Sequence, residues 1–208
     1  MFDKEFKEAI AQLPSKEKDK LIIRLLRKDL PLANRLYFEL IDDRSVDDRR
    51  IEMEERIKKK VKAMSDRYYS PGYLLMDVRY LSGDITEHVK ITKDKFGEAS
   101  LNILMLQEVI SRNSKRIQKA SPAKAKKLCV YIIARTFKIL TLIAKLHKDY
   151  HIDFQAPLEE LGNLIGANNR LMQTAIYHGL DINWIVTSEI PENIVEIQKE
   201  LRSKGYLK

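Results

Sequence analysis

The stretch "VISRNSKRIQKASPAKAKKLCVYIIARTFKILTLIAKLHK" (residues 109–148) contains eleven Lys and Arg residues and no Asp or Glu. The whole chain of 208 residues has 38 basic and 30 acidic side chains, which is a formal net charge of +8. Outside this stretch there are 27 basic and 30 acidic residues, so the positive excess of the protein is confined to it. The fold, the function or both must account for such a segment.

The second part of this stretch, residues 122–148, has the pattern of one long helix with two unequal faces. Between Leu128 and Leu146 nearly every position outside one narrow stripe is apolar. A helix that is apolar around most of its circumference packs at the centre of a bundle. We therefore expect residues 122–148 to form a central apolar helix with a single cationic strip facing water or a partner. The residues of the strip are three and four apart: Lys124, Lys127, Tyr131, Arg135, Lys138, Leu142 and Lys145.

The remaining sequence predicts more helices and no strand. Seven Gly and six Pro in 208 residues are few, which favours long helices joined by short connections. Helix-start signals recur, for example at Ser45 with Asp48 and at Ser70 with Pro71. We predict an all-α fold, a multi-helix bundle of eight to ten helices. Residues 1–208 are expected to form a single all-helical domain, with an N-terminal helical subdomain at 1–68 as an alternative division.

Two helix boundaries are expected in the middle of the chain. A helix that begins at Pro71 should end at Gly83, because glycine weakens a helix interior. Asp84 followed by Glu87 then resembles the capping box of the next helix. That helix is expected to be interrupted near Phe96–Gly97.

Composition also bounds the location of the protein. Cys129 is the single cysteine, which excludes an intrachain disulfide and suits a reducing compartment. The most apolar run is interrupted by Arg135, Lys138 and Lys145, so it is too polar to span a bilayer. The N-terminal residues lack the apolar core of a secretion signal. We expect a cytoplasmic protein with no membrane partner.

Two interpretations fit the basic strip. Any exposed helix face must be polar, and Lys stems cover apolar surface well, so the strip can be solvated surface alone. Under the same interpretation the strip can pair with acids elsewhere in the chain, such as Asp42, Asp43, Asp47 and Asp48. The strip can also be a binding site for an anionic partner, which would be nucleic acid, a nucleotide or an acidic protein. Under the second interpretation the segment before the helix extends the site. The expected anion-binding or nucleic-acid-binding residues there are Arg112, Lys115, Arg116, Lys119, Lys124, Lys127, Arg135 and Lys138.

A second candidate is the segment "LGNLIGANNRLMQTAI" (residues 161–176), which resembles the helix-turn-helix of DNA-binding proteins. Gly166 matches the turn glycine of that motif. The resemblance implies that Arg170 and Gln173 read base edges in a groove. A plain helix containing a glycine is the alternative. Asn168 favours a break, since in a continuous helix it would join the inward apolar stripe and need buried partners.

A third candidate is a set of carboxylates. All-α nucleotide pyrophosphohydrolases hold Mg²⁺ with Glu-x-x-Glu on one helix and Glu-x-x-Asp on the next. Glu52 with Glu55 resembles the first pair, and Asp84 with Glu87 resembles the second in reversed order. Carboxylates three apart share a helix face, which allows two of them to grip one hard cation. The resemblance implies a Mg²⁺-dependent nucleoside triphosphate pyrophosphohydrolase.

Two further segments are similar to a group of uncharacterised all-helical bacterial proteins, some of which carry a dUTP nucleotidohydrolase label. They are "LPSKEKDKLIIRLLRKD" (residues 13–29) and "VEIQKELRSKGYLK" (residues 195–208). Neither contains residues arranged for chemistry, so the resemblance implies an all-helical fold more than an activity.

A tyrosine-rich stripe beside Arg67 and Arg79 contains Tyr69, Tyr73, Met76 and Tyr80. It can be interpreted as the wall of a stacking pocket, but we expect it to pack in the core or in a homodimer. Taken together, the observations favour a non-enzymatic binding or scaffold module with a basic surface for an anionic partner such as nucleic acid. No cofactor is expected under this hypothesis. The alternative is the enzyme described above, which would require Mg²⁺.

Overall fold

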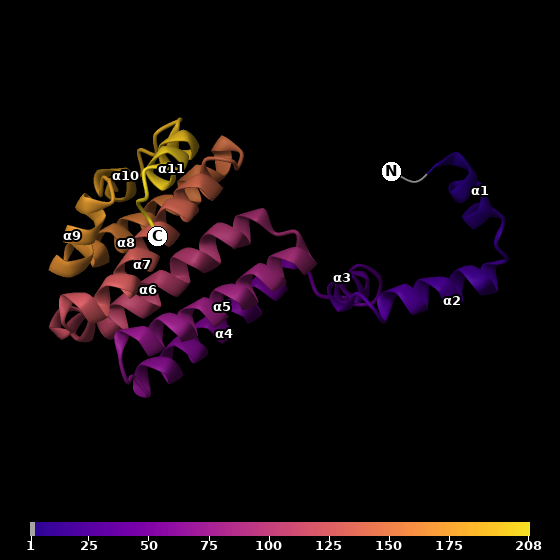
Figure 1. Cartoon of the computed structure of the whole chain (residues 1–208), viewed down its shortest axis with the longest axis horizontal. Helices are drawn as coiled ribbons and strands as arrows, with labels where there is room; N and C mark the ends of the chain where they lie inside the picture. The colour runs from indigo at the N-terminus through magenta and orange to yellow at the C-terminus, as the bar shows by residue number, and fades with distance from the viewer. Residues whose placement is uncertain (1–2) are drawn as a thin grey trace.

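A computed structural model describes residues 3–208 of the chain. Within that range there are eleven α-helices, one 3-10 helix and no strand, which confirms the all-α prediction. The elements, drawn in Figure 1, are α1 (Lys4–Gln12), α2 (Ser15–Leu26), α3 (Leu30–Leu40), α4 (Val46–Asp66), α5 (Pro71–Thr92), α6 (Lys95–Lys119), α7 (Pro122–Ile143), η1 (Lys148–Phe154), α8 (Gln155–Gly166), α9 (Asn169–Tyr177), α10 (Asn183–Val186) and α11 (Ile194–Ser203).

The first two helices stand away from the rest of the protein. Figure 1 shows α1 and α2 as an arm that leaves the body at α3. No described residue of α1, α2 or α3 is buried, although each helix carries apolar residues at helical spacing. Helix α4 packs against α6 and α5, so the part that stands apart is shorter than residues 1–68. The arm contributes little to the core.

Removal of residues 1–28 is expected to leave the body folded. Because no described residue of the arm is buried, the loss should resemble a surface change, within about 0.5 kcal/mol, or a shift in Tm of roughly 2 °C at this size. Thermal unfolding of residues 29–208 and of the full chain, followed by circular dichroism, measures the difference. A drop in Tm of more than about 5 °C would show that the arm packs against the body in solution.

Helix α7 lies at the centre of the body. Twelve of its residues are buried, and it packs against α5, α6, α9 and α11. Its exposed and half-exposed positions fall mainly on the stripe that contains Lys127, Tyr131 and Lys138. The prediction of a central apolar helix with one polar strip is therefore confirmed. The helix ends at Ile143 rather than near residue 148, because the chain turns there into η1.

The expected helix end at Gly83 was wrong. Helix α5 continues through Gly83 to Thr92, with eight buried residues along its inner face. Gly83 lies on the outer face, where an added Cβ would meet no atom within 4 Å. Burial of the apolar face outweighs the cost of one helical glycine, which is about 1 kcal/mol. Asp84 is consequently not a cap, and its carboxylate accepts from Lys60 Nζ at 2.5 Å.

The interruption expected near Phe96–Gly97 is present, slightly earlier in the chain. Lys93 adopts a left-handed conformation with φ of 60°, which ends α5. The buried Asp94 then caps α6 by accepting from the Gly97 N–H at 2.7 Å and from Arg50 Nε at 2.6 Å. A Cβ at Gly97 would overlap the Asp94 carboxyl group, so this cap requires glycine at that position.

The elements after α7 form a layer over one side of α6 and α7. Helix α8 packs against α6, and α9 and α11 pack against α7. The C-terminal tail returns towards α9, where the buried Leu207 donates its N–H to His178 Nδ1 at 3.2 Å. This contact holds the tail and the end of α11 beside the exposed strip of α7.

Candidate anion-binding site

The exposed strip of α7 forms one wall of a pocket of about 670 Å³ between α5, α7, α11 and the C-terminal tail. We call it the anion pocket. Among the described residues that line it there is no Asp or Glu, whereas several are Lys or Arg. Its polar and apolar lining residues other than Lys and Arg are Thr86, Val130, Tyr131, Ala134 and Leu207. Its basic lining residues are Arg79, Lys127, Arg135, Lys138, Arg202 and Lys208.

Tyr131 organises the guanidinium groups on the α7 wall. The Arg135 guanidinium lies 5.2 Å from the Tyr131 ring centroid, and Arg135 Nη2 donates to Tyr131 Oη at 2.8 Å. The Arg79 guanidinium lies 5.8 Å from the same ring centroid, at the α5 side of the pocket. Arg135 Nη1 also donates to Asn102 Oδ1 at 3.4 Å, so the Arg135 guanidinium is held from two sides. The stacked guanidinium of Arg79 keeps its N–H groups available for an anion in its plane. The contacts with Tyr131 therefore hold these guanidinium groups in place before an anion binds, so less side-chain entropy is lost on binding.

Only one lining cation is neutralised by a carboxylate. Lys138 Nζ lies 2.7 Å from Glu98 Oε1, which comes from α6. Within residues 3–208, Arg79, Lys127, Arg135 and Arg202 form no ion pair. Some cations elsewhere are paired, for example Arg44, Arg50 and Lys60 with acids on α4, α5 or the adjoining turns. The pocket thus concentrates uncompensated positive charge.

The residues before α7 do not extend the pocket as expected. Arg112 pairs with Glu108 on its own helix at 2.7 Å. Arg116 Nη1 donates to the Ser65 carbonyl oxygen at 2.5 Å, and its guanidinium lies over the Tyr68 ring. Both side chains therefore serve contacts within α6 and between α6 and α4. Lys115 and Lys119 remain exposed on α6.

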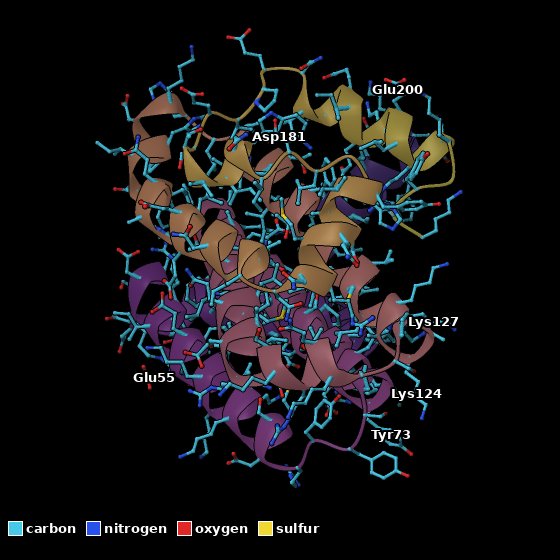
Figure 2. The ribbon with its side chains drawn as sticks, turned by 90° about the vertical axis from the view of Figure 1, so that its left-hand side faces the viewer. Glu55, Tyr73, Lys124, Lys127, Asp181 and Glu200 are labelled. Carbon is cyan, nitrogen blue, oxygen red and sulfur yellow. The ribbon has the colours of Figure 1, made fainter. Side chains whose placement is uncertain are left out.

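Lys124, in the first turn of α7, is exposed but does not line the pocket. In the view of Figure 2, Lys124 and Lys127 project from the same edge of the protein. The strip residues Lys127, Arg135 and Lys138, predicted from the periodicity of one helix, lie together as expected. Arg79 and Arg202 were not predicted as binding residues, because nothing in the sequence places α5 or α11 beside this strip.

The segment at 161–176 forms two helices, as its resemblance implies. Asn168 begins α9 as its cap and is fully buried, which confirms the break expected from this residue. Its side chain accepts from the Leu171 N–H and donates to the carbonyl and hydroxyl oxygens of Ser114. A buried asparagine thus has all the partners that it needs.

The Arg170 side chain points towards α6 rather than outward to a groove. Its Nε donates to the Ile117 carbonyl at 3.1 Å, and its Nη2 donates to the carbonyls of Gln118 and Ala120 at 3.0 and 2.5 Å. These groups lie at the C-terminal end of α6, where a helix has unpaired carbonyls and favours a positive charge. Gln173 is exposed and lines a separate hollow of about 470 Å³ with Lys126.

Cys129 also borders this second hollow but is fully buried. Burial raises the pKa of its thiol to about 11. The group is therefore a neutral thiol at neutral pH, whereas a nucleophile would need the thiolate.

Three of the four candidate carboxylates share a hollow of about 370 Å³ between α4 and α5. Glu52 and Asp84 there are paired with bases, since Arg44 Nη1 lies 2.9 Å from Glu52 and Lys60 Nζ lies 2.5 Å from Asp84. Glu87 lines the same hollow, but Glu55 does not. Figure 2 places Glu55 at the opposite edge of the view from Lys127.

The described range contains no cluster of three or more His, Cys, Asp or Glu side chains arranged for a metal ion. The hollow between α4 and α5 also contains arginines, which compete with a cation for the same carboxylates. Its histidine, His88, has a pKa lowered by burial. The geometry is that of ion pairs between two helices.

Among residues 3–208, no helix combines the length and the apolar character needed to cross a bilayer. Comparisons of the chain with models of protein families, with curated proteins and with solved structures gave no match.

Proposed function

We propose that the protein is a non-enzymatic, cytoplasmic nucleic-acid-binding module whose anion pocket takes the phosphate backbone. One observation carries the proposal: cations from three separate segments, α5, α7 and α11, meet in one pocket that no Asp or Glu side chain lines. A patch of one sign of charge in a hollow raises the local concentration of oppositely charged groups. Arginine is also the side chain best suited to grip phosphate through two parallel hydrogen bonds.

Like charges that lie close together repel each other and destabilise the folded state. If the protein bound no anion here, acidic residues among these cations would make the fold more stable. The protein has such acids in the described range, and it uses them elsewhere, around α4. At the anion pocket only Lys138 has a carboxylate partner. An anion that binds there removes the repulsion among Arg79, Lys127 and Arg135, which is a source of binding free energy.

The residues that line the anion pocket are suited to binding an anion and not to catalysing a reaction on it. No His, Cys, Asp or Glu side chain lines the anion pocket, so it offers no ordinary general base near neutral pH. The alternative function, a Mg²⁺-dependent pyrophosphohydrolase, would place its chemistry in the other hollow, at Glu52, Asp84 and Glu87. There Glu52 and Asp84 are already paired with Arg44 and Lys60.

A salt series of binding tests the proposal. Fluorescence anisotropy of labelled random-sequence RNA and DNA is measured with the unmodified protein from about 50 to 300 mM salt, where affinity should fall steeply as counterions are released. The double variant Arg79→Glu with Lys127→Glu should lose on the order of 30-fold in affinity near 0.1 M salt and show a shallower slope.

A matched control separates the pocket from overall charge. Lys7→Glu with Lys16→Glu makes the same charge change on the exposed arm and should change affinity by less than about threefold. Equal losses in the two double variants would contradict a localised site. Absence of binding at low salt would overturn the proposal, and so would tighter binding of an acidic polypeptide such as polyglutamate than of either nucleic acid.

A further inference from the structure

A row of large side chains lies exposed on the outer face of α5 and the turn before it. The exposed fractions are 80% for Tyr69, 58% for Tyr73, 51% for Met76 and 72% for Tyr80. We call these four residues the aromatic face. The expectation that they pack in the core is wrong, since all four are exposed while the inner face of α5 is filled by aliphatic residues. A contiguous row of exposed apolar side chains is a candidate binding surface.

The spacing of the aromatic face matches a ligand that runs along the helix. Tyr73 and Tyr80 are seven residues apart, which places them on one side of α5 about 10.5 Å apart along its axis. That span equals about three steps of stacked bases at roughly 3.4 Å each. Tyr69 and Tyr73 meet edge to face, with ring centroids 5.1 Å apart, so the row continues beyond the start of the helix.

Positive charge borders the aromatic face on the side of the anion pocket. Arg79, next to Tyr80 in the chain, lines the anion pocket with Lys127. Tyr80 itself borders a hollow of about 420 Å³ that contains Lys60, Arg67 and the exposed Asp77. Lys60 there is paired with Asp84, so Arg67 is the cation that this hollow adds. In the view of Figure 2, Tyr73, Lys124 and Lys127 all project from the same edge of the protein. A polymer with phosphates and flat apolar rings complements this combination.

We propose that the protein binds single-stranded nucleic acid, with phosphates in the anion pocket and bases stacked on Tyr73 and Tyr80. The inference rests on the proposed function and specifies its ligand. Aromatic side chains beside a basic groove stack successive bases of any sequence. A duplex cannot use these rings, because its base faces are covered by neighbouring pairs.

The charge around the aromatic face disfavours the homodimer expected from the sequence. A two-fold interface places the same surface of both copies together. An interface centred on Tyr73 and Tyr80 would bring two anion pockets close to each other, with the unpaired Arg79 and Lys127 of both copies. The like charges would repel, whereas a polyanion would be attracted.

The test compares ligands and tyrosine variants of the full chain at about 0.1 M salt. Affinity is measured for a 20-nucleotide single-stranded DNA, for RNA of the same sequence and for the matched duplex. Single strands should bind at least about tenfold more tightly than the duplex. Tyr73→Ala with Tyr80→Ala should weaken single-strand binding by about tenfold or more, since each base–ring stack makes a substantial contribution.

Two features of the variants identify stacking. Tyr73→Phe with Tyr80→Phe keeps the rings and should stay within about twofold of the unmodified protein. The alanine variant should keep the same salt slope, because it removes no cation. Both positions are exposed, so circular dichroism should show an unchanged fold.

The outcomes separate this inference from the proposed function. Absence of binding to any nucleic acid overturns both. Binding that prefers the duplex, or that the alanine variant leaves unchanged, overturns the single-strand inference and leaves the proposed function standing. A dimeric mass by light scattering that the alanine variant halves, with unchanged affinity, would assign the aromatic face to a second copy and also overturn the inference.

Discussion

Asp94→Ala is expected to lower the free energy of unfolding by about 3–5 kcal/mol. The side chain of Asp94 is 4% exposed, and its carboxylate holds two elements together. It accepts from Arg50 Nε at 2.6 Å and from the Gly97 N–H at 2.7 Å. Alanine would leave the Arg50 guanidinium, 18% exposed, with the exposed Asp47 at 3.0 Å as its remaining acidic partner, and would remove the cap of α6.

Related variants separate the two parts of this effect. Asp94→Asn keeps an oxygen for the Gly97 N–H but loses the ion pair, so it should recover only about 1 kcal/mol. Gly97→Ala should be destabilising as well, because its Cβ would overlap the Asp94 carboxyl group. Asp43→Ala, at an exposed position, is the control and should stay within about 0.5 kcal/mol. Urea unfolding measures all four, and a loss below about 1 kcal/mol for Asp94→Ala would contradict the packing described.

Arg170→Ala is expected to cost about 2–4 kcal/mol of stability, because a charged group makes three hydrogen bonds to carbonyls at the end of α6. The same variant should leave nucleic-acid affinity and sequence preference within about twofold when measured well below the Tm. Arg170 is a structural cap in this arrangement, whereas a helix-turn-helix protein would use it to read bases.

Gln173→Ala is the matched control for Arg170→Ala. Gln173 lies one turn further along α9 and is exposed, so its loss should change stability by no more than about 0.5 kcal/mol. The helix-turn-helix interpretation predicts a different pattern, in which both variants alter sequence preference and neither unfolds the protein. Binding assays on two unrelated sequences, together with urea unfolding, separate the two patterns.

The local pattern of the sequence predicted most helix positions. Ser45 and Asp48 form the reciprocal capping box expected of them, with the Ser45 hydroxyl accepting from the Asp48 N–H. The break at Asn168 was also predicted, because a polar residue on an apolar stripe conflicts with burial. These signals are local, so they can be read within one or two turns of a helix.

The boundary near Gly83 could not be predicted in this way. A glycine ends a helix or continues one according to the burial gained along the remaining turns, and that gain depends on distant helices. The actual boundary at Lys93 and Asp94 depends on Arg50, which comes from α4 and accounts for one of the two partners of the Asp94 carboxylate. In the sequence alone nothing shows that Arg50 lies beside Asp94, so Asp94 cannot be distinguished from any other aspartate.

The sequence by itself determined the class of the fold, the central helix α7 and the place of the cationic strip along it, because helical periodicity is a property of neighbouring residues. Only the tertiary structure decided which basic residues meet there. Packing of α5 and α11 against the buried faces of α7 brings Arg79 and Arg202 to Lys127 and Arg135, while Arg112 and Arg116 are drawn into contacts of α6. The core that directs this packing is aliphatic and its contacts are long-range, so no local pattern records which surface residues it brings together.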